Sequence, residues 1–364
     1  MKPQQYKHSL ICFFFFFAPH VIAVLVCSSG IQVAHASSHH HHHHHPRGGI
    51  SKLFVFGDSY ADTGNNRKPA SSWGVPYGIT FPGKPAGRFS DGRVLTDYLA
   101  SFIGIKSPIP YRWRKYAGHR IRDGLNFAYG GTGVFDTRIS PDPNMTTQID
   151  FFQKLIHSNV YSKQDLSSSV ALVSLAGNDY SNYIASNGSI QGLPGFIVSV
   201  VNQLALNMKR IHDLGVKKVA VIGLQPLGCL PRSTASSSYQ RCNGTENMAV
   251  GFHNSLLKEA VAKLNTESKS SAFVILDLYK AFTTVFNTSQ NHPGSVRFEN
   301  PLKPCCVGTS PEFSCGSVDF NGVKRYTVCE NPELAFFWDG VHPTQQGWFS
   351  VYSVLQASLD QIYT

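Results

Sequence analysis

The stretch that decides the fold is residues 53–66, which read LFVFGDSYADTGNN. Its first four residues are apolar and stop at Gly57, which is typical of a short buried strand that ends in a tight turn. Asp58 and Ser59 follow directly. Open parallel sheets bind ligands at the carboxyl ends of their strands, so this position suits a reactive serine. The alternative is that Ser59 only forms the turn or caps a helix.

Beyond this stretch the chain alternates short apolar runs with amphipathic segments. The pattern predicts strands at 170–175, 218–222 and 273–276, and helices at 94–103, 146–157, 194–215, 246–264 and 344–362. Continuous apolar strands between amphipathic helices predict a mostly parallel sheet covered on both faces, in one α/β domain over 51–364. Residues 62–92 and 290–333 lack this periodicity, and we expect both to be long surface loops.

The amino-terminal segment has the pattern of a secretory signal peptide over residues 1–36. Lys2 and Lys7 precede an apolar stretch, and Ala34-His35-Ala36 is a small-x-small cleavage pattern. The alternative is an uncleaved membrane anchor, but Pro19 and His20 interrupt the stretch before it reaches spanning length. We therefore expect secretion to the cell wall or apoplast, without stable membrane insertion after cleavage.

Seven consecutive histidines, His39 to His45, follow this segment. Such a run is either a purification tag or a native low-complexity tract, and the sequence leaves both open. We treat residues 37–50 as a histidine-rich segment outside the fold.

Composition excludes a disordered chain, since 42% of the 364 residues are hydrophobic and 15% are charged. A net charge of +10 is compatible with a nucleic-acid partner, but the sequence lacks the long basic runs of nucleic-acid-binding arms. We therefore expect no nucleic-acid partner. Residues 106–122 do interleave basic and aromatic side chains. They form either a solvated face or a subsite for an acidic or sugar-containing substrate.

Cysteines and glycosylation motifs agree with secretion. Outside the signal segment the chain has Cys229, Cys242, Cys305, Cys306, Cys315 and Cys329. An even count predicts three disulfides, with 15 possible pairings. We expect a Cys229–Cys242 link and two links within 305–329, and no metal site, because no CxxC pair exists. Four Asn-x-Ser/Thr motifs predict glycosylated surface loops at Asn144, Asn187, Asn243 and Asn287.

A second candidate segment, residues 336–343, reads FFWDGVHP. Asp339 and His342 lie three residues apart, so the carboxylate can orient the imidazole, which in turn can take a proton from a serine. Such a mechanism needs donors for an oxyanion. The glycines of NFAYGGTG (126–133) and the amide of Asn178 in AGND (176–179) are candidates, and each has the alternative of an ordinary turn.

Together these blocks resemble the plant GDSL esterase/lipase family, a branch of the SGNH hydrolases. The resemblance extends from Phe54 to Trp348 and rests on GDSYADTGNN, NFAYGGTG, AGNDY and FFWDGVHPT. The blocks PAGRFSDGR (85–93) and LQPLGCLP (224–231) are also typical of the plant branch. The resemblance implies a flavodoxin-like α/β/α sandwich. It also implies an esterase that needs no metal or organic cofactor.

Residue by residue, the resemblance makes Ser59 the nucleophile, His342 the general base and Asp339 its orienting carboxylate. The oxyanion hole would comprise the Ser59 and Gly131 backbone N–H groups and the Asn178 side chain, with Gly130 as the rival to Gly131. Two positions depart from the family pattern: Tyr60 replaces leucine, and Ala176 replaces glycine. Alanine disfavours a left-handed backbone at 176 but leaves the Asn178 amide in place.

Three functions fit these observations. The first is a secreted serine esterase acting on a small acyl ester, an acetylated carbohydrate or a lipid ester. The second is an acyltransferase that uses the same triad with an alcohol acceptor. The third is a non-catalytic binding protein on a hydrolase fold, which the intact Ser59, Asp339 and His342 argue against. The oligomeric state is left open by the sequence.

Overall fold

A computed structural model describes residues 49–288 and 298–364. The predicted signal segment 1–36 and the run His39 to His45 lie outside the described residues, so secretion remains a prediction. In the described part of the chain, no helix is both long and apolar enough to cross a bilayer.

The centre of the fold is a six-stranded sheet in the order β2-β3-β1-β4-β5-β6, with every neighbouring pair parallel. The strands are β1 (Lys52–Gly57), β2 (Ile109–Pro110), β3 (Leu125–Asn126), β4 (Ser169–Ser174), β5 (Lys218–Gly223) and β6 (Phe273–Asp277). In the sheet, β3 lies on one side of β1 and β4 lies on the other. The order β3-β1-β4-β5-β6 is flavodoxin-like, and its switch point lies at the carboxyl end of β1.

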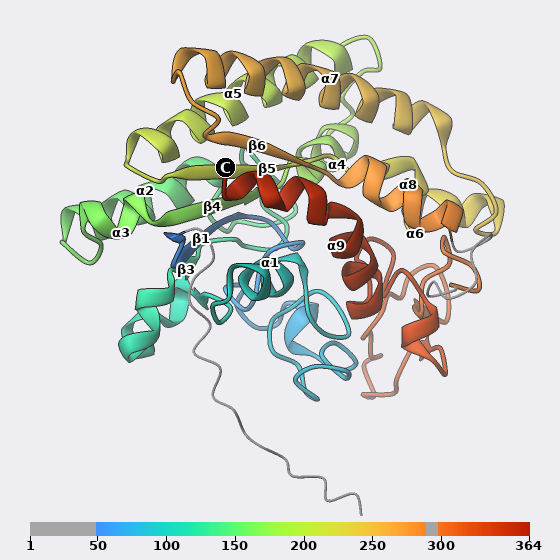
Figure 1. Cartoon of the computed structure of the whole chain (residues 1–364). Coiled ribbons are helices and arrows are strands. Elements are labelled where there is room, and N and C mark those ends of the chain that lie inside the picture. Colours follow the sequence, from blue (N-terminus) through green and yellow to red (C-terminus); the bar gives the residue numbers. More distant parts are fainter. Residues whose placement is uncertain (1–48, 289–297) are drawn as a thin grey trace, which may run out of the picture. The chain divides into compact units, whose positions relative to one another are not determined.

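Helices cover both faces of this sheet (Figure 1). One face carries α2 (Met145–His157), α5 (Leu193–Asp213) and α7 (Gly244–Glu267), and the other carries α1 (Leu95–Ile103), α8 (Leu278–Thr288) and α9 (Gln345–Leu359). The result is the expected three-layer α/β/α sandwich. Its buried interior includes Phe54 and Phe56 of β1, which pack on Phe152 of α2.

Polar side chains cap three of the predicted helices at their first turn. Asn144 accepts a hydrogen bond from the Thr147 N–H at 3.0 Å, and Thr344 accepts one from the Gly347 N–H at 2.9 Å. The side-chain oxygen of Asn243 caps α7 in the same way, because it accepts from the Thr245 and Glu246 N–H groups. Such caps satisfy N–H groups that lack a partner within the helix. The predicted helix bounds therefore lie within a few residues of the observed ones.

The periodicity missed the shorter elements. These are β2, β3, α3 (Lys163–Ser167), α4 (Gly177–Ala185), α6 (Pro231–Thr234) and α8. It also missed six 3₁₀ turns of the described chain at Ser71–Trp73, Tyr111–Tyr116, Gly118–Asp123, Leu227–Cys229 (η5), Ala235–Ser237 and Pro332–Leu334. A further 3₁₀ turn, Asp360–Ile362, ends the segment that was predicted as the helix 344–362. A two-residue strand carries no alternation to detect, and α4 has a largely polar sequence, for whose start an ordinary turn was the alternative.

Residues 298–333 are more ordered than the expected surface loop. Disulfides join Cys229 to Cys242, Cys305 to Cys329 and Cys306 to Cys315. Strands β7 (Cys306–Gly308) and β8 (Tyr326–Val328) pair antiparallel. The last two disulfides form a small apolar cluster with Tyr77 and Trp338. Because burial and cystines supply the order here, helix and strand periodicity could not reveal it.

The predicted glycosylation motifs differ in their exposure. Asn187 and Asn243 are exposed, whereas Asn144 is half-buried and donates from its amide to Asp136 at 2.7 Å. Asn287 lies in the last turn of α8, so its placement in a loop was wrong. Glycosylation itself remains a prediction for all four.

Gly57 is the glycine on which the β1 turn depends. A Cβ atom at this position would overlap the carbonyl oxygen of Ser174 on β4, which pairs with it in the sheet. We expect Gly57→Ala to cost more than about 2 kcal/mol and to lower the melting temperature by at least about 4 °C in thermal unfolding.

The matched control is Gly251→Ala on the exposed face of α7, where a Cβ atom would meet nothing within 4 Å. Alanine favours a helix over glycine by up to about 1 kcal/mol, so this variant should melt at the wild-type temperature or slightly above. Equal melting temperatures for the two variants would contradict the steric argument.

Candidate active site

Four segments that are far apart in the sequence meet at the carboxyl edge of the sheet. Ser59 follows β1, Gly131 follows β3 and Asn178 lies in the first turn of α4 after β4. Since β3, β1 and β4 are neighbours in the sheet, their carboxyl ends lie side by side. The loop before α9 adds Asp339 and His342. The structure thus brings together every candidate site residue of the sequence.

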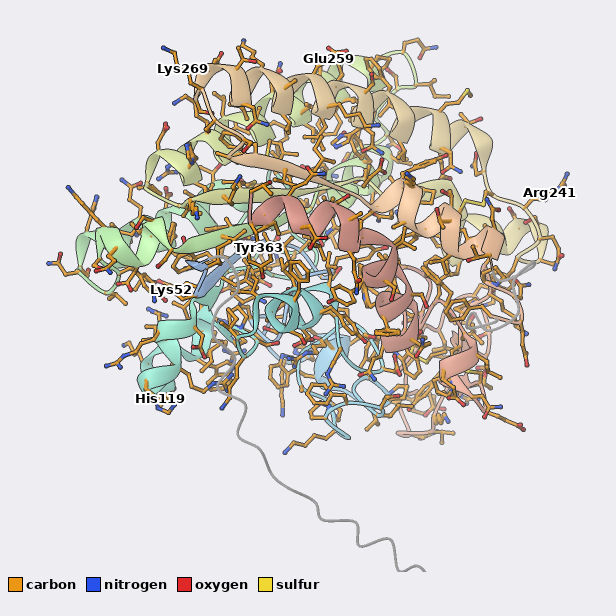
Figure 2. All side chains as sticks on the ribbon, in the orientation of Figure 1. Lys52, His119, Arg241, Glu259, Lys269 and Tyr363 are labelled. Atoms are coloured by element: carbon orange, nitrogen blue, oxygen red, sulfur yellow. A yellow bond between two sulfur atoms is a disulfide. The ribbon has the colours of Figure 1, made fainter. Side chains whose placement is uncertain are left out.

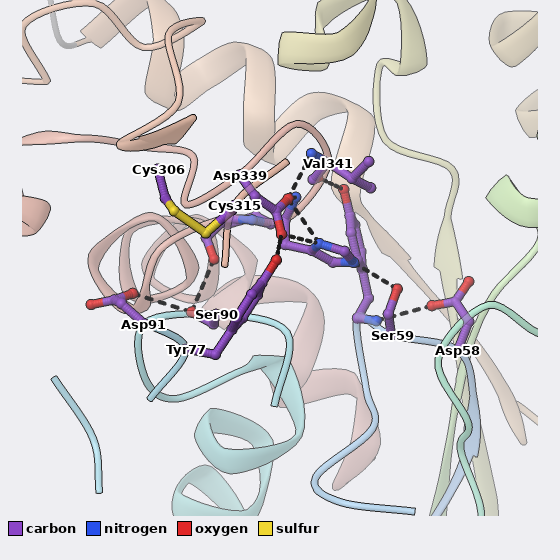
Figure 3. Close-up of polar contacts among 12 residues, drawn as sticks. Asp58, Ser59, Tyr77, Ser90, Asp91, Cys306, Cys315, Asp339 and Val341 are labelled. Carbon is purple, nitrogen blue, oxygen red and sulfur yellow. Dashed lines mark hydrogen bonds and ion pairs between the residues drawn. A yellow bond between two sulfur atoms is a disulfide. The ribbon is translucent and has the colours of Figure 1, made fainter. Parts of the chain in front are cut away.

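Ser59, His342 and Asp339 form a continuous hydrogen-bonded chain. His342 Nε2 lies 2.8 Å from Ser59 Oγ, and His342 Nδ1 lies 2.9 Å from both carboxylate oxygens of Asp339. Figure 3 shows Ser59 and Asp339 on opposite sides of the imidazole ring. Ser59 is 8% exposed, so this serine is largely shielded from solvent but still accessible to it.

The Asp339 carboxylate is buried and fully partnered. It accepts from its own loop, through the Val341 and His342 N–H groups at 2.8 Å, and from the Tyr77 hydroxyl at 2.7 Å (Figure 3). Burial by itself would raise the pKa of Asp339, but the charge of His342 and these hydrogen bonds outweigh it and lower the pKa below its ordinary value. Asp339 therefore stays ionised beside the imidazole.

Tyr77 is a site residue that the sequence did not reveal. Burial and the Asp339 charge raise the pKa of its hydroxyl well above the ordinary value, so it remains a donor. It comes from the segment 62–92, which has no periodic signal. Its contact with Asp339 spans 262 residues of sequence, so no local pattern could have indicated it.

Two aromatic rings position the imidazole. The ring of Phe89 packs against His342 with centroids 5.1 Å apart, and the Tyr60 ring lies edge-on at 5.8 Å. The Tyr60 hydroxyl also donates to the Val341 carbonyl at 2.9 Å. Tyrosine at this position therefore ties the serine turn to the histidine loop, which leucine cannot do by hydrogen bonding.

The candidate oxyanion donors differ in whether their N–H groups are already used. The Gly130 N–H donates to Asp62 at 3.2 Å and to the side-chain oxygen of Asn66. Within residues 49–288 and 298–364, the backbone N–H groups of Ser59 and Gly131 have no acceptor. Of the two adjacent glycines, Gly131 is therefore the one whose N–H has no acceptor among the described residues.

The Asn178 side chain is oriented by its neighbours. Its amide nitrogen donates to the Thr132 carbonyl at 2.9 Å and lies 3.4 Å from an Asp58 carboxylate oxygen. Ala176, two residues earlier, has φ of 117°, so the expectation that alanine would keep this position out of the left-handed region was wrong. This sterically strained turn starts α4 directly after β4 and so brings Asn178 to the sheet edge.

Two buried aspartates hold the surrounding loops together. Asp62 accepts from the backbone N–H groups of Gly64 and Asn65, both at 2.7 Å, and from that of Gly130. Asp179 accepts from Val134 and Phe135 at 2.9 Å, which links α4 to the glycine loop. Asp62 thus bonds both its own turn and the glycine loop, and Asp179 joins that loop to α4.

The basic and aromatic segment 106–122 contributes no side chain to this site. Arg112 donates to the Asn66 carbonyl at 3.0 Å, and Arg114 lies 3.9 Å from the Tyr111 ring centroid. His119 projects into solvent (Figure 2). Across the described residues, no cluster of three or more histidine, cysteine or acidic side chains has the geometry of a metal site.

Comparison with known proteins agrees with this arrangement. A family model described as GDSL-like lipase/acylhydrolase matches residues 53–348. Two GDSL esterase/lipases of Arabidopsis thaliana are 65% and 57% identical over 312 and 316 residues, covering 85% and 86% of this chain and 87% and 89% of their own. Acetylajmalan esterase 2 of Rauvolfia serpentina is 31% identical over 326 residues, covering 81% of this chain and 86% of its own.

An α/β/α fold with this serine–histidine contact at its switch point has the arrangement of a hydrolase. The chain belongs to the GDSL-like lipase/acylhydrolase family. It is a carboxylic ester hydrolase.

Tyr77→Phe tests the hydrogen bond that fixes Asp339. A hydrogen bond to a buried carboxylate stabilises the charge by about 1.5–3 kcal/mol, and this variant loses it. We therefore expect kcat on a short-chain ester to fall roughly 10- to 100-fold, with little change in KM. The matched control is Tyr98→Phe, which removes a 2.9 Å bond to the Gln345 carbonyl instead. Equal losses of kcat in both variants would indicate a general effect on folding.

Asp58 makes the stability of the folded chain depend on pH. Burial raises its pKa from 3.8 to about 7, despite the Tyr60 N–H and the His342 charge. Between these values the folded chain keeps a proton that the unfolded chain has released, so this group's contribution to stability falls as pH rises from about 4 to 7. In thermal unfolding, the melting temperature of Asp58→Asn minus that of wild type should increase by at least about 2 °C between pH 5 and pH 8. A difference that does not change with pH would refute the assignment.

Proposed function

We propose that this protein is a secreted serine esterase that hydrolyses acyl or acetyl esters through an acyl-enzyme. The observation that carries the proposal is the hydrogen-bonded chain from Ser59 through His342 to Asp339, at 2.8 and 2.9 Å. A serine hydroxyl is a weak nucleophile until a neighbouring base removes its proton, and His342 is in position to do so.

In the proposed reaction, Ser59 Oγ attacks the ester carbonyl carbon while its proton passes to His342 Nε2. The ionised Asp339 holds Nδ1 protonated and stabilises the imidazolium. His342 then protonates the departing alcohol, and the carbonyl re-forms as an acyl-serine. Water, deprotonated by the same imidazole, hydrolyses that ester and releases the acid and free Ser59.

The negative oxygen of each tetrahedral intermediate needs donors that are fixed before the reaction begins. We assign this role to the N–H groups of Ser59 and Gly131, which have no acceptor among the described residues, and to the Asn178 amide. The Asn178 nitrogen already donates to the Thr132 carbonyl at 2.9 Å, and an oxyanion would replace its longer 3.4 Å contact with Asp58. Asp179 supports the assignment because it links the loop of Gly131 to the helix of Asn178. Gly131 is favoured over Gly130, whose N–H donates to Asp62 and Asn66.

Secretion and an acetyl or short acyl substrate complete the proposal. Three disulfides in the described residues favour an oxidising compartment. The relative named acetylajmalan esterase 2 supports acetyl esters as one substrate class, beside acetylated carbohydrate and lipid esters.

Ser59→Ala tests the triad directly. Without the nucleophile, p-nitrophenyl acetate turnover should fall by at least about 10³-fold while the melting temperature stays near wild type. Ser199→Ala on α5, an exposed serine whose hydroxyl bonds only its own helix, is the matched control and should retain full activity. Equal product release by Ser59→Ala and wild type would exclude the mechanism.

Secretion has its own test. The chain expressed with its first 36 residues in plant cells should appear in the medium or cell wall, with a mature amino terminus at Ser37. Intact-mass and amino-terminal peptide mass spectrometry give the result. Retention inside the cell with Met1 still present would overturn this part of the proposal.

A further inference from the structure

A small pocket opens directly beside Ser59. Besides Ser59, it is lined by the polar side chains of Asp58, Asn178, Gln225 and Arg232. Aliphatic side chains complete most of the lining, namely Leu175, Ile222, Leu224, Leu227, Leu230 and Val341. Most of these residues lie at or just beyond the carboxyl ends of β1, β4 and β5. The lining is therefore mixed, with polar and aliphatic side chains around one small space.

The geometry of the reaction gives this pocket a role. A tetrahedral intermediate on Ser59 directs its oxyanion toward Gly131 and Asn178 and its alcohol oxygen toward His342. The remaining substituent is the acyl group, and the aliphatic side chains of the pocket beside Ser59 suit its apolar carbon atoms. This step rests on the proposed function.

The pocket is far smaller than most ligand sites. Its volume is about 20 Å³. That is close to the least that holds one water molecule, and so matches the methyl of an acetyl group. A butyryl or longer chain needs several times this space.

A much larger apolar cavity of about 310 Å³ lies on the other side of Leu227. It is formed by α4, α5 and α7, and its lining includes Tyr183, Ile184, Ile190, Leu193, Ile197 and Ala249. Leu227 and Arg232 line both spaces. Arg232 is exposed, whereas Leu227 is 7% exposed, so Leu227 is the buried residue between the two.

The backbone around Leu227 is fixed in place. The neighbouring Gly228 N–H donates to the Asn247 side chain at 2.9 Å, and Cys229 is linked to Cys242. A Cβ atom at Gly228 would overlap the Asn243 carbonyl, so η5 packs closely on the start of α7. Substrate binding therefore cannot easily move this wall aside.

We infer that Leu227 determines acyl-chain length: it closes the Ser59 pocket at acetyl size and separates it from the large apolar cavity. Wild-type protein accordingly hydrolyses acetyl esters in preference to longer ones. Shortening this side chain joins the two spaces and admits a medium-length acyl chain.

The test compares kcat/KM for p-nitrophenyl acetate, butyrate and octanoate. Wild type should turn over acetate at least tenfold better than octanoate. In Leu227→Ala, the octanoate-to-acetate ratio should rise at least tenfold, and Leu227→Val should show a smaller rise in case the alanine variant folds poorly. The control Leu206→Ala removes an exposed leucine of α5 that borders neither space and should leave the ratio unchanged.

A second substitution locates the gained space. Ala249 lines the large cavity and not the Ser59 pocket, so adding Ala249→Phe to Leu227→Ala should abolish the gain on octanoate. The inference is overturned if wild type prefers octanoate, or if Leu227→Ala and Leu227→Val leave the ratio unchanged. If either result is found and Ser59→Ala is inactive, the proposed serine mechanism still holds and only the role of Leu227 is wrong. The two proposals can therefore be tested separately.

Discussion

The hydrogen bonds to the buried carboxylate of Asp339 are the interaction on which the site depends. A buried charge is stable only when partners replace its lost water, and Asp339 receives the His342 ring, two N–H groups of its own loop and the Tyr77 hydroxyl. Each partner fixes a different part of the chain. The loop N–H groups set the turn, Tyr77 secures the segment after β1, and the imidazole is aimed at Ser59. The alignment needed for proton transfer thus follows from satisfying one buried carboxylate.

The disulfide-linked segment 305–329 forms hydrogen bonds with the residues that precede Asp339. The Cys305 and Cys306 N–H groups donate to the carbonyls of Phe337 and Trp338 at 2.9 and 2.7 Å, immediately before Asp339. Trp338 and Tyr77 pack into the same cluster as the cystines. This segment has little periodic structure, but covalent links and burial hold it rigid, and its hydrogen bonds fix the residues next to Asp339. The cystines therefore bear on the site as well as on overall stability.

Parallel strand order explains why one serine turn meets three other segments. With β1 between β3 and β4, the turns after all three strands open at one edge of the sheet. Asp62 and Asp179 then bond these turns to one another, which uses the Gly130 N–H, whereas the Gly131 N–H has no acceptor within residues 49–288 and 298–364. The same edge holds the small pocket that Leu227 borders. The proposed chemistry and the proposed acyl selectivity thus both depend on loops fixed at this edge of the sheet.

The sequence by itself determined the α/β/α fold, the long helices and main strands, and the identities of Ser59, Asp339, His342 and Asn178 as candidates. These features leave local signals, since periodicity, caps and short motifs each lie within a few residues. Only the tertiary structure showed that the Gly130 N–H already has acceptors, showed the left-handed Ala176, and revealed Tyr77, Phe89 and Leu227. Those features depend on which distant groups come into contact and on how much space remains between them. Contacts across 262 residues, such as Tyr77 to Asp339, exist only once the chain has folded.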